Sequence, residues 1–365
     1  MGTLILEGNI GLDLEKMLLD NIAQVANERG ISIETAIQLV SDKIPNLIAK
    51  ISDIYKSGLE KNKDEYICYN NDLIKGFESR LYETWKNPLD IFELLIVMCR
   101  ELGSETNSKF RSKDFVGKSY KLEVLTRLHA HTVHIACEIM QLLKGGYADG
   151  AMARWRSMHE SAVISRIIDS SSDGVAKKYY LHKFIDDFKF SQTYMKYSDE
   201  LGFERMEKKD FDAIRERYDE LIKDYGRSYA GDNGWAVEII GKERVTFYDL
   251  ERFANLSYLR PYYKFSSVRV HLGSKSLDYK LSLSLSEKQN GDEVLIAGPS
   301  NEGLFDPMQC TAMSLIDVTV ILISQIDNMN NIVFERILHA WNEDLKVALV
   351  EASEQLSKKG MEEND

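Results

Sequence analysis

Arg156 and Glu160 stand four residues apart in a predicted helix, so their side chains share one face. Apolar neighbours such as Met158 and Val163 predict that this helix lies close to a core. Removing a charged pair from water costs free energy, so a buried pair requires a functional or structural reason. Arg156 could bind an anionic group that Glu160 orients, or the pair could clamp two helices together.

Two later segments add polar residues and turns. The spacing over 261–272 predicts a helix, on which His271 could donate or accept a proton near neutral pH. The glycines and prolines of 297–307 predict a turn whose backbone amides could hold an anion, although an ordinary structural turn is the alternative. We predict that both segments meet the helix over 149–168 in one pocket. Its ligand-binding residues would be Arg156, Glu160, Tyr263, Ser267, His271, Ser300 and Asn301.

Arg154 and His159 have the Arg-x4-His spacing, which resembles the catalytic signature of the HEPN ribonucleases. In that family of helical bundles, Arg and His act on RNA phosphodiesters, usually across a dimer. On this interpretation Arg154, His159 and His271 would be catalytic, RNA would be the substrate, and the chain would form a homodimer. Arg154 and Arg156 lie about 200° apart around a helix, so both cannot face one site.

A polar stripe precedes these residues at steps of three and four. It comprises Glu123, Arg127, His131, His134 and Glu138. Such a stripe is typical of the solvated face of an amphipathic helix. Imidazole and carboxylate groups also suit zinc or iron, but a His-Glu-x-x-His arrangement is missing. We therefore expect no metal and no cofactor.

The chain has 365 residues and a net charge of −12, which disfavours a protein that coats nucleic acid or anionic membranes. The stretch from Lys109 to Arg127 is nevertheless locally basic. The four cysteines are far apart and predict buried free thiols in a reducing compartment. The most apolar segment, 312–326, contains Asp317 and Gln325 and is too short to span a bilayer. We expect a cytoplasmic protein without a membrane partner.

Apolar residues at helical spacing dominate and predict an all-α multi-helix bundle. Pro45 should kink or split one early helix, and residues 103–118 look like a loop. Ser119 is a favoured N-cap for a helix to Leu143, and a short turn would join that helix to 149–168 as a hairpin. Leucine and serine alternate over 281–286 and Asn290-Gly291 follows. This pattern predicts one small β-hairpin near 280–297.

The expected organisation has three parts. Residues 1–78 would form a helical extension, residues 79–345 the helical core domain with the pocket, and residues 346–365 a helix end and frayed tail.

The segments of the predicted pocket resemble a bacterial family of helical proteins known as domain of unknown function 5677. The resemblance lies in Arg156-Ser157-x-x-Glu160, in Tyr-Tyr-Lys followed by Ser-x-x-Val-His within 262–271, and in 297–307. Gly234-Trp235-Ala236 is also similar. The resemblance covers roughly residues 80–330 and implies a mostly helical bundle, with no established activity.

These observations favour a binding or sensor module for a small anionic ligand or a partner protein. One alternative is a ribonuclease-like effector, either a toxin or a phage-defence component. The other is a purely structural polar network in which Arg156, Glu160 and His271 fix helix packing. The sequence leaves open whether the protein is an enzyme.

Overall fold

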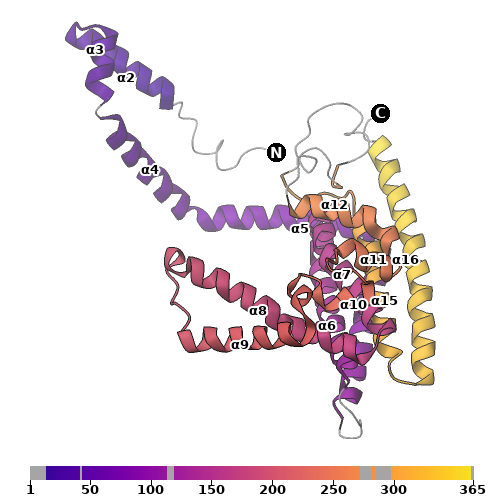
Figure 1. Cartoon of the computed structure of the whole chain (residues 1–365). Coiled ribbons are helices and arrows are strands. Elements are labelled where there is room, and N and C mark those ends of the chain that lie inside the picture. Colours follow the sequence, from indigo (N-terminus) through magenta and orange to yellow (C-terminus); the bar gives the residue numbers. More distant parts are fainter. Residues whose placement is uncertain (1–13, 42, 113–118, 272–280, 284–296, 363–365) are drawn as a thin grey trace. The chain divides into compact units, whose positions relative to one another are not determined.

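The computed structural model describes residues 14–41, 43–112, 119–271, 281–283 and 297–362 (Figure 1). Every regular element within these ranges is a helix, which confirms the predicted all-α class. The chain divides into two compact units, with the boundary between Arg80 and Leu81.

The first unit consists of short helices and the start of a long one: α2 (Leu14–Arg29), α3 (Ile33–Ser41), α4 (Ile44–Lys61) and α5 (Lys63–Phe110). Ile22, Ala26 and Ala36 form a small buried apolar cluster. Pro45 lies in the first turn of α4, where its missing N–H needs no helical partner. The predicted break at Pro45 is therefore confirmed.

The second unit is built around a helical hairpin, α6 (Tyr120–Lys144) and α7 (Ala148–Ser170). The Ser119 hydroxyl accepts a hydrogen bond of 3.2 Å from the backbone N–H of Leu122, so the predicted N-cap is confirmed. Gly146 follows α6 with φ 77°, a left-handed conformation that glycine adopts without strain. This short turn allows α6 and α7 to pack along each other.

Helix α15 (Phe305–Ile323) packs against both α6 and α7. Buried Trp155 of α7 donates from Nε1 to the Cys310 carbonyl at 2.9 Å and to the Ser314 hydroxyl at 3.1 Å. Arg166 of α7 binds the Asp317 carboxylate through two hydrogen bonds of 2.8 Å. Large, fully buried side chains of this core include Trp85, Phe92, Leu125, Ile135, Ile139, Leu143, Met152 and Trp155.

Among the described helices, α15 is long and apolar enough to cross a membrane by length and composition alone. However, 72% of its apolar stretch is buried inside the protein. That burial is typical of the core helix of a bundle, which passes the same test of length and composition.

Helix α5 departs from the prediction in its second half. Trp85 has φ −103° and ψ 16°, which kinks the helix there, because Pro88 cannot donate a helical hydrogen bond and its ring is crowded. The loop predicted over 103–118 is wrong for residues 103–110, which continue α5. Gly103 explains the difference, since it lies directly against the buried ring of His129 on α6. Tertiary packing therefore keeps a polar stretch helical.

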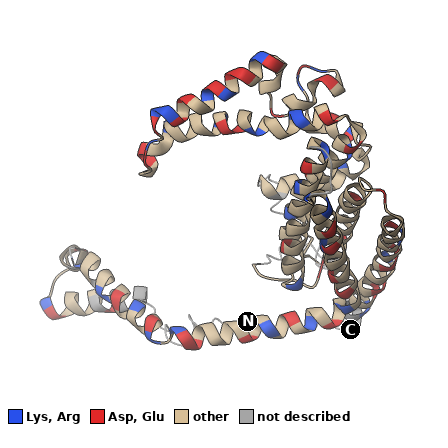
Figure 2. Cartoon of the chain, turned by 90° about the horizontal axis from the view of Figure 1, so that it is seen from below, with Lys and Arg blue, Asp and Glu red and all other residues tan. Residues whose placement is uncertain are grey.

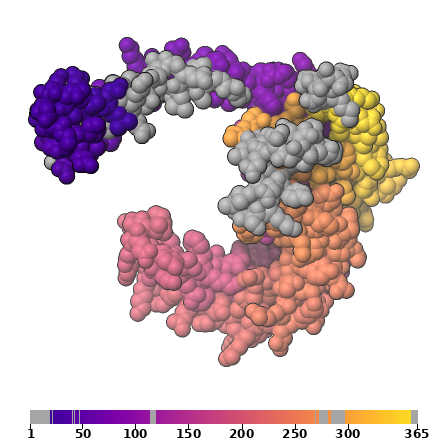
Figure 3. Space-filling view, turned by 90° about the horizontal axis from the view of Figure 1, so that it is seen from above, coloured from indigo at the N-terminus to yellow at the C-terminus, as the bar shows by residue number. Residues whose placement is uncertain are grey.

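The remaining elements cover this core: α8 (Asp173–Leu201), α9 (Lys208–Tyr225), η1 (Arg227–Ala230), η2 (Gly234–Ala236), α10 (Val237–Ile240), α11 (Phe247–Phe253), η3 (Ser257–Leu259), α12 (Arg260–Val270) and α16 (Met329–Glu362). Helices α8 and α9 pair, with Phe188 stacked on Tyr218 at 4.3 Å between ring centroids. Figure 2 shows charges of both signs along them. Helix α12 packs on α7, and α16 packs on α15. The yellow atoms of α16 lie at the surface in Figure 3.

The predicted β-hairpin near 280–297 falls mostly on residues 284–296, which lie outside the described residues. Residues 281–283 are described and form turns, so a strand beginning at Leu281 is wrong. The Asp149 carboxylate accepts hydrogen bonds from the backbone N–H groups of Leu281 at 3.1 Å and Ser282 at 3.4 Å. These amides are therefore used by a side chain and not by a neighbouring strand.

The four cysteines are free, and Cys99 and Cys310 are buried. Cys137 is half-buried and Cys68 is exposed, so the prediction of buried thiols is wrong for Cys68 and holds only in part for Cys137. Cys68 lies in the part of α5 that belongs to the first unit, where few side chains of the described residues are buried.

We expect Gly103→Ala to lower the free energy of unfolding by about 1–3 kcal/mol, as overpacking does. The added Cβ would overlap the His129 ring, which also lies 3.1 Å from the Thr319 hydroxyl and so cannot shift freely. Gly150→Ala is the control, because its Cβ would meet Leu142 at an ordinary 3.6 Å. Chemical denaturation measures both variants, and equal stability would contradict this close approach.

We also expect His129 to make stability depend on pH. Burial lowers the pKa of His129 from 6.5 to about 4. Between these values the unfolded chain binds a proton that the folded protein does not, so stability is full above 6.5 and falls as the pH drops toward 4. The loss approaches about 1.4 kcal/mol per pH unit within that window.

Denaturation curves recorded across this window test the prediction. The slope of the unfolding free energy against pH reports the number of protons taken up on unfolding, and replacing His129 by Gln should reduce that number by about one. An unchanged slope in that variant would assign the pH dependence to other groups.

Candidate functional site

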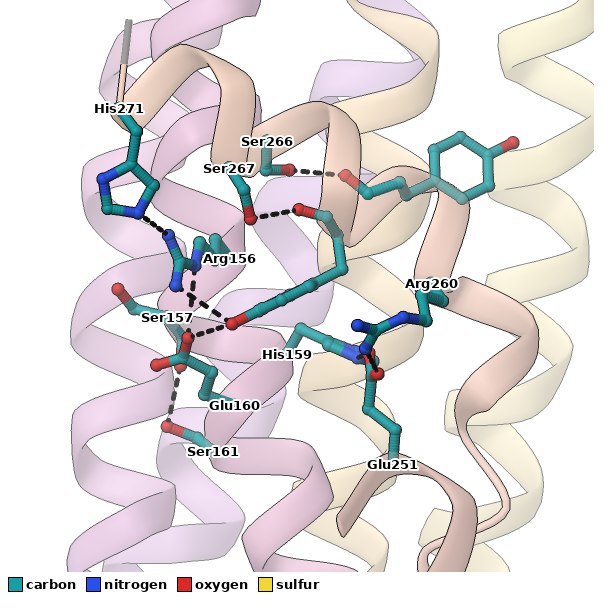
Figure 4. A network of polar contacts seen from close by, with 12 residues as sticks. Arg156, Ser157, His159, Glu160, Ser161, Glu251, Arg260, Ser266, Ser267 and His271 are labelled. Atoms are coloured by element: carbon teal, nitrogen blue, oxygen red, sulfur yellow. Dashed lines mark hydrogen bonds and ion pairs between the residues drawn. The ribbon is translucent and has the colours of Figure 1, made fainter. Parts of the chain in front are cut away.

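Arg156 lies at the centre of a polar cluster between α7 and α12 (Figure 4). Its Nε donates to Oε1 of Glu160 at 3.2 Å, and its Nη2 donates to the Tyr263 hydroxyl at 3.0 Å. Its Nη1 lies 3.0 Å from Nε2 of His271. The structure thus brings together four residues, of which the first and last, Arg156 and His271, are 115 positions apart in the sequence. We call Arg156, Glu160, Tyr263 and His271 the Arg156 cluster.

Tyr263 closes this cluster on its buried side. Its hydroxyl donates to Oε1 of Glu160 at 2.7 Å, and the Arg156 Cζ lies 4.9 Å from its ring centroid. Burial and the hydrogen bond to Glu160 raise the pKa of Tyr263 to about 12, so the phenol keeps its proton near neutral pH. Ser267 does not enter the cluster, because its hydroxyl donates to the Tyr263 carbonyl at 2.8 Å within α12.

The guanidinium of Arg156 has two edges with different surroundings. Nε and Nη2 form the edge that Glu160 and Tyr263 fill. Nη1 points from the other edge to His271, which is exposed. Since an arginine has no acceptor, the imidazole Nε2 must accept this hydrogen bond, which requires a neutral ring protonated on Nδ1. The Arg156 side chain is 23% exposed, so this edge reaches solvent.

His159 lies in a second network, whose imidazole and carboxylate are closed to solvent. Its side chain is 0% exposed and sits beside the rings of Trp155, Phe247 and Tyr263. Its Nε2 lies 3.0 Å from Oε1 of Glu251, and the other carboxylate oxygen of Glu251 binds Arg260 (Figure 4). An RNA phosphodiester cannot reach this imidazole without local opening of the protein.

Arg154 faces α6 and not His159. Its Nε binds the Glu138 carboxylate, which also lies 3.1 Å from Nε2 of His134. The hydrogen bond from Arg154 is the main cause that lowers the pKa of Glu138. The pair with HEPN spacing therefore does not converge, and His271 lies with Arg156. Among the described residues, no group of three potential ligands is placed to hold a metal ion.

Ser300 and Asn301 lie in a turn that fastens other segments together. The Ser300 backbone N–H donates to the Gly146 carbonyl at 3.0 Å, and its hydroxyl donates to the Ser282 carbonyl at 2.8 Å. The Trp85 indole donates to the Asn301 carbonyl at 3.0 Å. None of these hydrogen bonds reaches the Arg156 cluster, so within the described residues the predicted pocket residues take partners in two separate groups.

Spacing in the sequence does not point to Glu251, the partner of His159, or to Arg260, which binds Glu251. Glu251 is 92 positions from His159, and no spacing rule connects residues so distant. A local signal exists, however. Glu251 stands with Phe247, Leu250 and Ala254 in the i, i+3, i+4, i+7 pattern of an apolar helix face. A carboxylate within such a face predicts a buried partner.

We expect Glu251→Ala to lower the free energy of unfolding by about 3–5 kcal/mol, because it would leave Arg260 and His159 facing each other without a carboxylate. Glu251→Gln should cost less, since its amide oxygen can still accept one hydrogen bond. Glu238→Ala is the matched control: its exposed carboxylate pairs only with Lys178, and we expect little change. Thermal and chemical denaturation provide the measurement, and similar losses for Glu251→Ala and Glu238→Ala would contradict a buried network.

Residues 122–290 match the model of the family of unknown function DUF5677. This segment includes the whole Arg156 cluster and the His159–Glu251–Arg260 network, whereas Ser300 and Asn301 lie beyond it. It is shorter than the range of roughly 80–330 over which the sequence resembles that family. No curated protein and no solved structure matches the chain significantly. The segment that carries these clusters is thus the part of the chain that is similar to DUF5677.

Proposed function

We propose that the protein is a binding or sensor module and that Arg156 is the residue that binds an anionic group of its ligand. The observation that carries this proposal is that the two edges of the Arg156 guanidinium have different partners. Glu160 and Tyr263 hold one edge, whereas the contact described for Nη1 on the other edge is with the exposed imidazole of His271.

This arrangement lowers the cost of binding. The Glu160 and Tyr263 contacts fix the orientation of Arg156, and binding to an oriented group loses less conformational entropy. The carboxylate of Glu160 and the incoming anion would contact different edges of the guanidinium, which limits their repulsion. A small carboxylate or phosphate would thus find a positioned donor at the surface.

His271 would exchange partners when the ligand binds. Its neutral Nε2 is a weaker acceptor for Arg156 than an anionic oxygen, because charge-assisted hydrogen bonds are roughly twice as strong as neutral ones. This step links ligand binding to the C-terminal end of α12, where His271 is the C-cap residue.

The structural alternative makes a different prediction for the same residues. A pure clamp between α7 and α12 would lose stability on Arg156→Ala but would show no saturable response to any ion. The ribonuclease alternative gains no support from the Arg154 and His159 geometry, since the two side chains have separate partners.

We expect small anions without rings, among them inorganic phosphate, pyrophosphate and short dicarboxylates, to raise the melting temperature of the protein saturably. A ligand present at 100 times its Kd stabilises by about 2.7 kcal/mol. The saturable rise should disappear in Arg156→Ala and weaken in Tyr263→Phe, which removes one of the groups that orient the guanidinium.

Arg154→Ala is the matched control, because Arg154 lies on the same helix but binds Glu138. The Arg154→Ala variant should keep the saturable rise in melting temperature. Salts that are excluded from the protein surface also stabilise proteins in general, and because this effect does not depend on any one arginine, it should appear in every variant. A panel without saturable stabilisation, or a response that persists in Arg156→Ala, would refute the proposal.

A further inference from the structure

A cavity of about 460 Å³ lies between α6, α8 and the turn that precedes η2. None of the four residues of the Arg156 cluster lines it. We call it the α6–α8 cavity. Its volume is within the range of about 300–1,000 Å³ that is usual for small-molecule sites.

One side of the cavity is apolar and aromatic. The apolar and aromatic lining residues there are Val124, Leu128, Ile164, Tyr179 and Trp235. Tyr179 meets Trp235 edge to face, with 5.0 Å between ring centroids. Burial raises the pKa of Tyr179 to about 12, so it remains a neutral phenol near neutral pH. Such a wall suits a flat ring system, which gains both burial and aromatic contacts.

One end of the cavity is cationic. The Lys183 ammonium lies 4.4 Å from the ring centroid of Tyr180, and the Arg127 guanidinium lies over the same ring at 5.8 Å. Arg127 shares the carboxylate of Glu123 with Arg111, so one carboxylate serves two cations. No ion pair with a described carboxylate holds Lys183. This end therefore carries excess positive charge. Arg127 is also the last residue of the locally basic stretch that begins at Lys109.

One turn further along α8, towards the turn that precedes η2, the lining is rich in hydrogen-bond acceptors. It contains Asp186 and Asp232 beside His182, with Asn233 next to them. The Asp232 carboxylate accepts from Lys189 at 2.9 Å and is otherwise almost fully exposed. Carboxylates and an amide at this end could accept hydrogen bonds from sugar hydroxyls or ring amino groups.

The turn that forms this end is rigid. Nε2 of His182 lies 3.2 Å from the Tyr229 carbonyl and 2.9 Å from the Gly231 carbonyl. Gly234 lies so close to the Tyr229 carbonyl that any Cβ would overlap it. The Asn233 amide donates to the Val245 carbonyl at 3.1 Å. These contacts hold this wall of the cavity in place, which favours binding.

We propose that the α6–α8 cavity binds a nucleoside monophosphate, with the phosphate at Arg127 and Lys183, the ring system along the aromatic wall, and hydroxyl or amino donors at Asp186 and Asp232. This polarity requires a small ligand that is anionic at one end, flat, and donor-bearing at the other. The net charge of −12 disfavours a long polynucleotide, whose many phosphates would meet an acidic surface. The proposal does not depend on the function assigned to Arg156.

Isothermal titration calorimetry of the full chain with the common nucleoside 5′-monophosphates tests it, with adenosine and ribose 5-phosphate as partial ligands. We expect at least one nucleotide to bind, and both partial ligands to bind at least about tenfold more weakly, because each lacks one set of contacts. Lys183→Ala should weaken binding by about tenfold or more, since it removes a charge-assisted contact with the phosphate. Tyr180→Leu, which removes the ring beneath the two cations, should also weaken it.

Lys177→Ala is the matched control, because Lys177 lies on the same helix over the ring of Tyr120 and does not line the cavity. It should bind like the wild type, and so should Arg156→Ala. Circular dichroism verifies that each variant is folded. The proposal is overturned if no nucleotide binds at millimolar concentration, or if ribose 5-phosphate binds as tightly as a nucleotide. Loss of binding in Arg156→Ala but not in Lys183→Ala would also overturn it.

Discussion

Helix α7 packs against α6, α12 and α15, and this enclosure decides what each of its ionisable side chains can do. A charge or imidazole near the core costs free energy unless it finds a partner or reaches solvent. Three of these groups find carboxylates on other helices: Arg154 with Glu138, His159 with Glu251, and Arg166 with Asp317. These contacts fix the rotation of α7 against its neighbours, and the position of Arg156 depends on that rotation.

The two networks next to α12 differ in what they leave open. The carboxylate of Glu251 is fully buried between His159 and Arg260, so solvent does not reach it. The Arg156 cluster has the same kinds of group, but one edge of its guanidinium reaches the surface beside His271. Similar residue types thus form a buried structural network around His159 and, one helical turn away, a candidate binding site at Arg156.

The segment that matches DUF5677 does not contain the whole core of the second unit. Residues 122–290 include α6 and α7, but α15, which closes the core, begins at Phe305. Trp155 and Arg166 within the matched segment take their partners from Cys310 and Asp317 beyond it. Without α15, Trp155 and Arg166 would lose these partners, so this part of the bundle depends on residues outside the family match.

The sequence by itself determined the helical class, the α6–α7 hairpin, the Ser119 cap and the break at Pro45, because apolar spacing, capping side chains and proline act over a few residues. It could not determine that Gly103 packs on His129, that Asp149 uses the amides at Leu281, or that Glu251 is the partner of His159. Only the tertiary structure decided these contacts and the separation of Ser300 and Asn301 from Arg156. The physical reason is that a partner across the fold is selected by packing, whereas sequence spacing reports only neighbours on the same helix.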